Sequence, residues 1–223
     1  MRLVLAGLLG VSCAAAQQAT PAAREPHHHT VYEDPRVRIL DVQIEPRGAT
    51  QLHRHDADSV SISTAGMQFS RGGIAHVERN ANDSVLRQIT IELLQKQSNP
   101  HNVCGEVLPG EYAHCREPGS EWLGANLQLQ FETDQTRFGV LRIEPNATLA
   151  IPPADVPPVL IALEGTEAEA VSRTNGASVA SGSRRSVKAA DVLRWPADQV
   201  SEIRNTGNTA ARFLVVEFGG PGE

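Results

Sequence analysis

Residues 33–66, EDPRVRILDVQIEPRGATQLHRHDADSVSISTAG, decide the fold because they recur without a gap at residues 132–165, ETDQTRFGVLRIEPNATLAIPPADVPPVLIALEG. Pairs that are identical at this offset of 99 include Arg38 and Arg137, Pro46 and Pro145, and Gly66 and Gly165. Farther along the chain the offset becomes 125, and Asn80 recurs as Asn205. A repeat of this length in a chain of 223 residues predicts two similar halves of roughly 100 residues each.

The second copy has lost the histidines of the first. In the register of the repeat, His53 and His55 correspond to Pro152 and Ala154. His76 corresponds to Ser201. We therefore expect one polar site in the first half and none at the matching place in the second.

Short runs of alternating apolar and polar residues fill both halves, and turn residues separate them. The clearest runs are residues 37–44, 60–63, 86–93, 127–131, 138–143, 159–163 and 213–218. Alternation of this kind predicts strands, and many short strands at regular spacing predict a barrel or a sandwich. The second half is 26 residues longer between Gly165 and Pro196, because the offset grows from 99 to 125. Within this extra stretch, Asn175-Gly176 predicts a hairpin turn.

The histidine motifs resemble those of the cupin superfamily, whose first motif holds a glycine, a His-x-His pair and a second glycine, and whose second motif holds a glycine, a histidine and an asparagine. The residues that carry the resemblance are Gly48, His53, His55, Gly66, Gly73, His76 and Asn80. The likeness covers about residues 30–93 and 129–218. It implies an all-β fold of two tandem double-stranded β-helix (cupin, jelly-roll-like) barrels, at residues 30–95 and 127–219, the second with a degenerate metal site.

The geometry of strands supports a metal site in the first barrel independently of the resemblance. Side chains two positions apart share one face of a strand, so His53 and His55 point together into the barrel, where His76 can reach them from another strand. Three convergent imidazoles suit a divalent metal such as Fe(II), Zn, Mn, Ni or Cu. We therefore predict that His53, His55 and His76 are metal ligands.

The carboxylate ligand of the cupin motif is missing. Ser59, or Val60 at the longer spacing, stands where the family usually places a glutamate. Asp56 and Asp58 are near, but they have the opposite strand parity to the histidines, so only a bulge would turn one of them into the barrel. The sequence thus predicts three histidines with open coordination positions.

The resemblance leaves the activity open. Similar three-histidine centres occur in cupin dioxygenases, which implies a metal-dependent oxidoreductase, and an isomerase is equally compatible with the ligands. A non-catalytic protein that binds a metal or a small molecule is the alternative, and a structural role with unmetallated histidines is a third. In the first two cases the expected partner is a small-molecule substrate or ligand.

The N-terminal residues predict export. Arg2, an apolar run over residues 3–11 and the small residues 14–16 are typical of a signal peptide that is cleaved after Ala16. Lipidation of Cys13 is the alternative processing step. The mature protein is then periplasmic or secreted.

Residues 17–29 begin with an Ala-, Gln- and Pro-rich run and are expected to be a disordered leader. The leader ends in the tract His27-His28-His29. A free histidine tract is usually solvated, but the following strand would start close to the barrel, so that one of these imidazoles could hang over its mouth.

Residues 96–126 join the two halves and contain Cys104 and Cys115. In an oxidising compartment a disulfide between the two cysteines is expected, and a thiolate metal site with His101 and His114 is the alternative.

Charge and hydropathy exclude two classes of partner. The chain has 20 basic and 26 acidic residues, a net charge of −6, and its basic residues are scattered, which argues against a nucleic-acid partner. No apolar stretch approaches the roughly 20 residues of a membrane-spanning helix, so no membrane association is expected after signal cleavage. Exposed edge strands would allow a homodimer.

Overall fold

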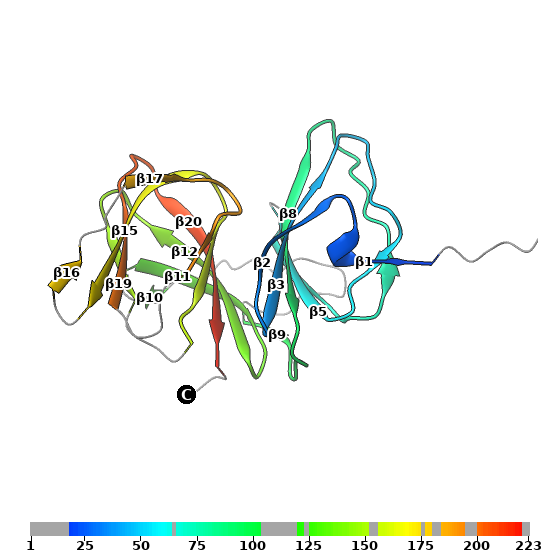
Figure 1. The fold of residues 1–223 in the computed structure, drawn as a ribbon, viewed down its shortest axis with the longest axis horizontal. Helices are drawn as coiled ribbons and strands as arrows, with labels where there is room; N and C mark the ends of the chain where they lie inside the picture. The colour runs from blue at the N-terminus through cyan, green and yellow to red at the C-terminus, as the bar shows by residue number, and fades with distance from the viewer. Residues whose placement is uncertain are drawn as a thin grey trace, which may run out of the picture.

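The computed structural model describes residues 18–63, 66–103, 120–122, 125–151, 156–174, 177–179, 184–194 and 200–219. Within these ranges the regular structure is β-strand apart from one short 3-10 helix, η1 (Ala22–Arg24). Two β units lie side by side, the first built from the N-terminal half and the second from the C-terminal half (Figure 1). The predicted all-β fold with two tandem barrels is confirmed.

The main sheet of the first half has the order β2-β3-β8-β5-β6. Its strands are β2 (His28–Glu33), β3 (Val37–Ile44), β8 (Leu86–Leu93), β5 (Asp58–Ser63) and β6 (Gly66–Ser70). A smaller sheet, β1-β4-β7, contains β1 (Thr20–Pro21), β4 (His53–Arg54) and β7 (Ala75–His76). All pairings are antiparallel except β1 with β4, which is parallel.

The second half repeats this order at the centre of its larger sheet, as β11-β12-β20-β14. This sheet consists of β9 (His101–Asn102), β10 (Ser120–Trp122), β11 (Ala125–Glu132), β12 (Thr136–Ile143), β20 (Ala211–Phe218), β14 (Val159–Ala162) and β18 (Val192–Leu193). The other sheet consists of β13 (Thr148–Ile151), β19 (Val200–Asn205), β15 (Thr166–Thr174), β16 (Ala177–Val179) and β17 (Arg184–Val187). Strands β15 to β17 come from the longer stretch of the second half. Thr174 pairs with Ala177, and the intervening Asn175 and Gly176 lie outside the described residues.

Equivalent turns in the two halves use the same hydrogen bonds. Asp34 Oδ1 accepts hydrogen bonds from the backbone of Arg36 and Val37, and Thr133 Oγ1 accepts them from Gln135 and Thr136. The Asn80 side chain donates to the Ile44 carbonyl, and the Asn205 side chain donates to the Ile143 carbonyl. Asx-type turns and clamps of this kind fix where strands end, so the asparagine of the second motif has a structural role in both halves.

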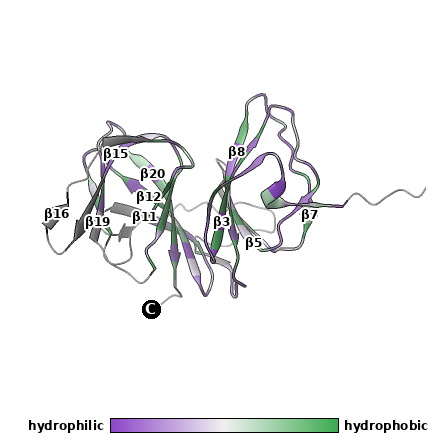
Figure 2. Cartoon of the chain, viewed as in Figure 1, coloured by the Kyte–Doolittle hydropathy of each residue, from purple (hydrophilic) through white to green (hydrophobic). Residues whose placement is uncertain are grey.

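A shared apolar core joins the two halves. Alternate residues of β3, β5 and β8 turn toward the second half, where Phe131, Phe138 and Leu214 meet them. The rings of Phe69 and Phe131 stack with 5.1 Å between their centroids, and Arg36 lies over the Phe218 ring at 4.6 Å. Hydrophobic residues accordingly mark the strands on both sides of this contact (Figure 2).

The leader differs from its expected disorder. From residue 18 onward it is described, with β1, η1 and the start of β2 lying against the first barrel. Ala22 is buried in a small apolar cluster with Leu40, Val42 and Ile44, and Thr20 donates a backbone hydrogen bond to Leu52. Sequence composition missed this segment because its order comes from tertiary contacts rather than from its own pattern.

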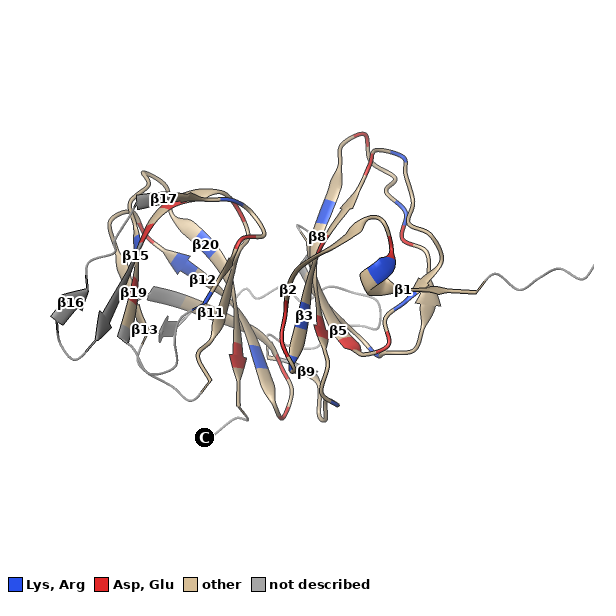
Figure 3. Cartoon of the chain, in the orientation of Figure 1, with Lys and Arg blue, Asp and Glu red and all other residues tan. Residues whose placement is uncertain are grey.

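Several predictions concern residues outside the described ranges. The signal peptide at residues 1–16, Cys13, Cys104, Cys115 and His114 lie there, so the export signal and the disulfide stay predictions. The joining segment 96–126 is described in part and contributes β9 and β10, both paired with β11. Across the part of the chain that the structure describes, no helix has the length and apolarity needed to cross a membrane. Basic and acidic residues are spread over both halves (Figure 3).

Candidate metal centre

Two short strands bring the predicted histidines together. His53 on β4 lies directly opposite His76 on β7, and His55 follows β4 by one residue. The Gly73 backbone donates a 2.7 Å hydrogen bond to the His55 carbonyl, which holds the two motifs in register. The centroids of the His53 and His76 rings are 4.4 Å apart, and those of His53 and His55 are 5.3 Å apart.

A fourth histidine joins this cluster from the N-terminal segment. His28, the first residue of β2, is only 5% exposed, and its ring centroid lies 4.5 Å from that of His53. His28, His53 and His55 each offer a nitrogen, and these three atoms lie within 4.8 Å of one another. Among the described residues they are the one group of three or more His, Cys, Asp or Glu that could hold a metal ion.

His76 lies at the rim of the cluster. Its side chain is 38% exposed, its ring stacks on that of His55 with 5.5 Å between centroids, and its Nε2 is 3.7 Å from Glu78 Oε1. The structure thus brings all three predicted ligands together, but the buried set of mutually close donors contains His28 rather than His76. The histidine tract in the leader was the sequence signal for His28, although nothing in the tract distinguishes it from its neighbours.

Hydrogen bonds from Nδ1 orient the imidazoles of His53 and His55. His53 Nδ1 lies 2.9 Å from the Gln51 carbonyl oxygen, and His55 Nδ1 lies 2.9 Å from Glu92 Oε1. A carbonyl and a carboxylate only accept hydrogen bonds, so Nδ1 carries a proton in both rings and Nε2 is the nitrogen through which each ring could bind a metal. This arrangement, with the outer nitrogen donating and the inner nitrogen free, is the usual one for metal-bound histidine.

The Glu92 carboxylate belongs to a longer chain of ion pairs. Arg38 Nη1 donates to Glu92 Oε2 at 2.6 Å and also pairs with Glu33 through Nε. Although burial alone would raise the pKa of Glu92, the hydrogen bonds from His55 and Arg38 lower it overall. Glu92 is therefore ionised at neutral pH, which favours the tautomer of His55 that donates to it.

Several buried nitrogen and oxygen atoms at the cluster have no hydrogen-bond partner among the residues that the structure describes. They are both ring nitrogens of His28, Nε2 of His53 and Oε2 of Glu78. Burial, together with the neighbouring His53, lowers the pKa of His28 to about 4, and burial also lowers the pKa of His53. Both imidazoles are therefore neutral at pH 7, which is the form that binds metals.

Two carboxylates flank His28 Nε2, but they differ in the hydrogen bonds that they accept. Glu25 Oε2 is 4.0 Å away and Glu78 Oε2 is 3.9 Å away. The Glu25 oxygens accept hydrogen bonds from the His27 and Gln51 backbones and lie close to the His27 ring. Glu25 thus ties the N-terminal segment to the loop that leads into β4.

The aspartates near the first motif point elsewhere, as their strand parity predicts. Asp56 pairs with Arg54 at the surface, and Asp58 accepts hydrogen bonds from Arg71 and the Gly72 backbone. Neither is in the group of candidate metal donors.

A divalent ion fits the donor set. Metal–imidazole bonds of about 2.0–2.1 Å place the nitrogens of two ligands roughly 3–3.5 Å apart in tetrahedral or octahedral geometry. The three nitrogens are already within 4.8 Å of one another, so small side-chain adjustments bring them into bonding range. Orphaned lone pairs in buried, neutral imidazoles are what such an ion would satisfy.

The interior of the second barrel is apolar where the first is polar. Strand registers make Leu127 the counterpart of His28, because His28 pairs with Val42 and Leu127 pairs with Leu141. Opposite Ser201, where the first half has His53 opposite His76, lies Ile151. Leu127 and Ile151 belong to one buried apolar cluster, whereas Pro152 and Ala154 lie outside the described residues.

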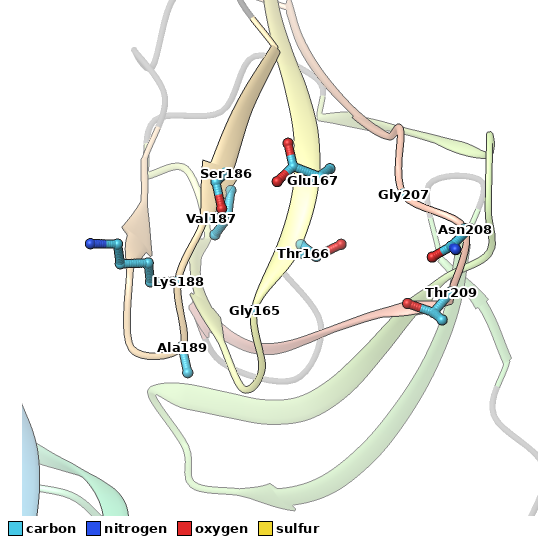
Figure 4. Close-up of a pocket in the computed structure, with 10 residues that line it drawn as sticks. All are labelled: Gly165, Thr166, Glu167, Ser186, Val187, Lys188, Ala189, Gly207, Asn208 and Thr209. Carbon is cyan, nitrogen blue, oxygen red and sulfur yellow. The ribbon is translucent and has the colours of Figure 1, made fainter.

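Two pockets open away from the histidine cluster. One, of about 330 Å³, lies beside Arg38, Arg54 and Glu92, and none of the four imidazoles lines it. The other, of about 460 Å³, lies in the second half between the Glu167 and Ser186 strands and the turn at Asn208 and Thr209 (Figure 4). Its lining offers hydroxyl, amide and carboxylate groups but no histidine.

The comparisons with known proteins found solved structures with a similar fold but no protein with a similar sequence. No protein-family model matches the chain, and no curated protein matches it in sequence. Among solved structures, AerE from Microcystis aeruginosa superposes with a TM-score of 0.58 at 9% identity, over 87% of this chain and 98% of that chain.

Oxalate decarboxylases are also similar in fold. The Lactobacillus farciminis enzyme in its formate complex has a TM-score of 0.54 at 13% identity, over 84% of this chain and 78% of its own. A Bacillus subtilis oxalate decarboxylase structure, described for its Mn(II) centres, has a TM-score of 0.55 at 10% identity, over 85% and 71%. Identities this low show the fold alone, and that fold is the all-β cupin fold in two copies.

Proposed function

We propose that the protein binds one divalent metal ion in its N-terminal barrel through His53, His55 and His28, and that a small molecule is bound or converted at this ion. The observation that carries the proposal is the convergence of three buried imidazoles, each of which has a nitrogen within 4.8 Å of the nitrogens of the other two. His76, the third ligand expected from the sequence, lies beside them at the rim and is tested separately.

The first barrel also offers an approach to the ion. His28 and His53 are buried, and His53 pairs with Thr20 of the N-terminal segment, whereas His76 is half-exposed and its neighbours Ile74 and Val77 are 63% and 39% exposed. A small molecule would therefore approach from the side of β7. A bound divalent metal would act there as a Lewis acid, and the chain would hold and orient the ion through its imidazoles.

The proposed class is a metal-dependent oxidoreductase or isomerase that acts on a small molecule. The folds of oxalate decarboxylases, one of them described for its Mn(II) centres, support testing Mn(II) with small carboxylates first. The alternative is a non-catalytic metal-binding or small-molecule-binding protein. The burial of His28 and His53 favours this alternative, because a buried ion exchanges ligands slowly.

We also propose that the protein is exported. Residues 1–16 have the pattern of a signal peptide, so the protein would load its metal outside the cytoplasm. The second barrel, with its apolar interior, would serve as the scaffold that supports the first through their shared core.

Metal content tests the proposal. Protein expressed without a histidine tag is analysed for bound metals as wild type, as His28→Ala and as the double variant His53→Ala/His55→Ala. We expect about one metal per chain in the wild type and a near-complete loss in both variants. Equal metal content in all three proteins would refute the site.

Oxygen uptake and product analysis of the loaded protein then separate the two classes. The panel of compounds contains small carboxylates, thiols and diketones. The variant His76→Ala is assayed in parallel and tests whether the histidine at the rim takes part. Turnover of any member supports the enzyme, and tight binding without turnover supports the binding protein.

A further inference from the structure

Glu78 brings a carboxylate to the edge of the imidazole cluster, outside the group of mutually close donors that His28, His53 and His55 form. Its Oε2 lies 3.9 Å from His28 Nε2, and its Oε1 lies 3.7 Å from His76 Nε2. Oε2 is buried and has no hydrogen-bond partner among the described residues. A buried anionic oxygen without a donor is costly, so this atom calls for a cation or a proton.

The rest of the residue is held in place. The Glu78 backbone donates to Thr50 Oγ1 at 2.9 Å, and its carbonyl accepts a hydrogen bond from the Thr50 backbone at 3.0 Å. Gln88 Nε2 donates to Oε1 at 2.9 Å. One carboxylate oxygen is thus fixed by an amide, while the other is left open on the side of the histidines.

The second carboxylate near His28 differs in this respect. Both oxygens of Glu25 accept backbone hydrogen bonds, from Gln51 on one side and from His27 on the other. Of the two acidic groups within 4.0 Å of His28 Nε2, only Glu78 therefore has an oxygen left for an ion.

The second half shows what replaces this arrangement when the histidines are absent. At the repeat offset of 125, Glu78 corresponds to Ile203 and Gln88 corresponds to Phe213. Both counterparts are buried in the apolar cluster of that barrel. The carboxylate and the amide that holds it are lost together with the imidazoles, whereas Arg38 and Glu92 are retained as Arg137 and Glu217.

We propose that Glu78 is the fourth protein ligand of the metal and replaces the carboxylate that the first motif lacks. This inference rests on the proposed metal site. Glu78 reaches the ion from the second motif, two residues after His76 and outside the first motif, where Ser59 stands in place of a glutamate. In this arrangement His76 is not a ligand of the ion, and its imidazole lies beside the Glu78 carboxylate at the rim.

A carboxylate ligand changes the metal preference of the site. Imidazoles suit Ni, Cu, Zn and Fe, and carboxylates add affinity for harder ions such as Mn(II). Removal of the Glu78 charge should therefore weaken Mn(II) binding more than Ni(II) binding. Ligand loss of this kind is expected to lower Mn(II) affinity at least about tenfold.

The test is a titration of tag-free, metal-free protein with Mn(II) and Ni(II), and the visible spectrum of the Co(II) form. The variants are Glu78→Gln, which keeps the shape, and Glu45→Gln, which removes the same charge from an exposed position of the same half. We expect Glu78→Gln to lose about tenfold or more in Mn(II) affinity, to lose less for Ni(II), and to alter the Co(II) spectrum. Glu45→Gln should stay within about twofold of the wild type, since an exposed charge is screened by solvent.

Two outcomes would overturn the inference. One is a Glu78→Gln variant with the Mn(II) affinity and Co(II) spectrum of Glu45→Gln. If circular dichroism shows that Glu78→Gln is unfolded, Glu78→Asp takes its place, because it keeps the charge but withdraws the oxygen. Unchanged Mn(II) affinity in Glu78→Asp would then overturn the inference.

His53→Ala separates this inference from the proposed function. If His53→Ala loses the metal while Glu78→Gln retains it, the imidazole site stands and Glu78 is not a ligand. If neither variant changes metal binding, the proposed function fails as well.

Discussion

At the scale of single residues, the site is set by which hydrogen bonds each imidazole makes. His53 and His55 donate from Nδ1 to the Gln51 carbonyl and to Glu92, and their Nε2 atoms remain available. The His-x-His motif predicted that these two imidazoles are neighbours, and their ring centroids lie 5.3 Å apart. Their role as metal ligands stays a prediction. The sequence indicated that one histidine of the tract at residues 27–29 could reach the barrel, but it did not single out His28, since this depends on where the N-terminal segment docks.

Glu92→Gln tests the outer hydrogen bond of His55. The substitution removes the charge that orients the ring and pairs with Arg38, so metal affinity should fall about 10- to 100-fold while the protein stays folded. Isothermal titration with the metal that the wild type retains measures this change. Glu144→Gln, an exposed change in the second half, is the control, and equal affinities in the two variants would contradict this role for Glu92.

Acid should destabilise the metal-free protein through His28. The folded pKa of His28 is about 4 and its ordinary value is 6.5, so between these pH values the unfolded chain binds a proton that the folded chain does not. Stability is therefore fully present above about pH 6.5 and is lost as the pH falls toward 4, by on the order of 3 kcal/mol.

The counterpart residue in the second barrel provides the matched variant for this effect. His28→Leu introduces the side chain of Leu127, which should remove the acid sensitivity due to His28 and abolish metal binding. Urea unfolding at pH 7, 6 and 5 in the presence of a chelator measures both proteins. Parallel pH profiles for the wild type and His28→Leu would contradict the assignment.

At the scale of elements, alternation identified the long strands, and tertiary contacts decided the short ones. Strands β3, β8, β12 and β20 follow the apolar periodicity of the sequence. The two-residue strands β1, β4 and β7 have no such pattern, because they exist only through pairing with one another. The leader is likewise ordered by its contacts with the first barrel rather than by a pattern in its own sequence.

Docking of the N-terminal segment should be necessary for metal binding. Ala22 is 1% exposed in the apolar cluster of the first barrel, so Ala22→Asp buries a charge there and should release the segment together with His28. We expect metal affinity to fall about tenfold or more and hydrogen exchange at residues 18–29 to increase. The neighbouring Ala23→Asp, at a less buried position, should change neither quantity, and a similar loss in both variants would argue against docking through Ala22.

At the scale of the whole molecule, the two halves have diverged around a common framework. The ion pairs of Arg38 with Glu33 and Glu92 recur as those of Arg137 with Glu132 and Glu217. The repeat therefore predicted the architecture well. It predicted the site less completely, because the residues that distinguish the barrels, including Glu78 and Gln88, are not among the positions that the recognised motifs define.

The shared core should make the two halves unfold together. Phe138 is fully buried among apolar residues of both halves, and truncation of such a ring costs about 3–5 kcal/mol. Phe138→Ala should lower the melting temperature of the whole protein in a single transition measured by calorimetry. Val31→Ala, at an exposed position, should have little effect, and two separate transitions in the wild type would contradict a common core.

The most direct test of the metal centre is a crystal structure of the tag-free, metal-loaded protein with anomalous diffraction recorded at the absorption edge of the bound metal. We predict one anomalous peak in the N-terminal barrel, within bonding distance of His28, His53 and His55, and none in the C-terminal barrel. A peak bound elsewhere, or imidazoles that remain apart in the loaded protein, would contradict the proposed metal centre.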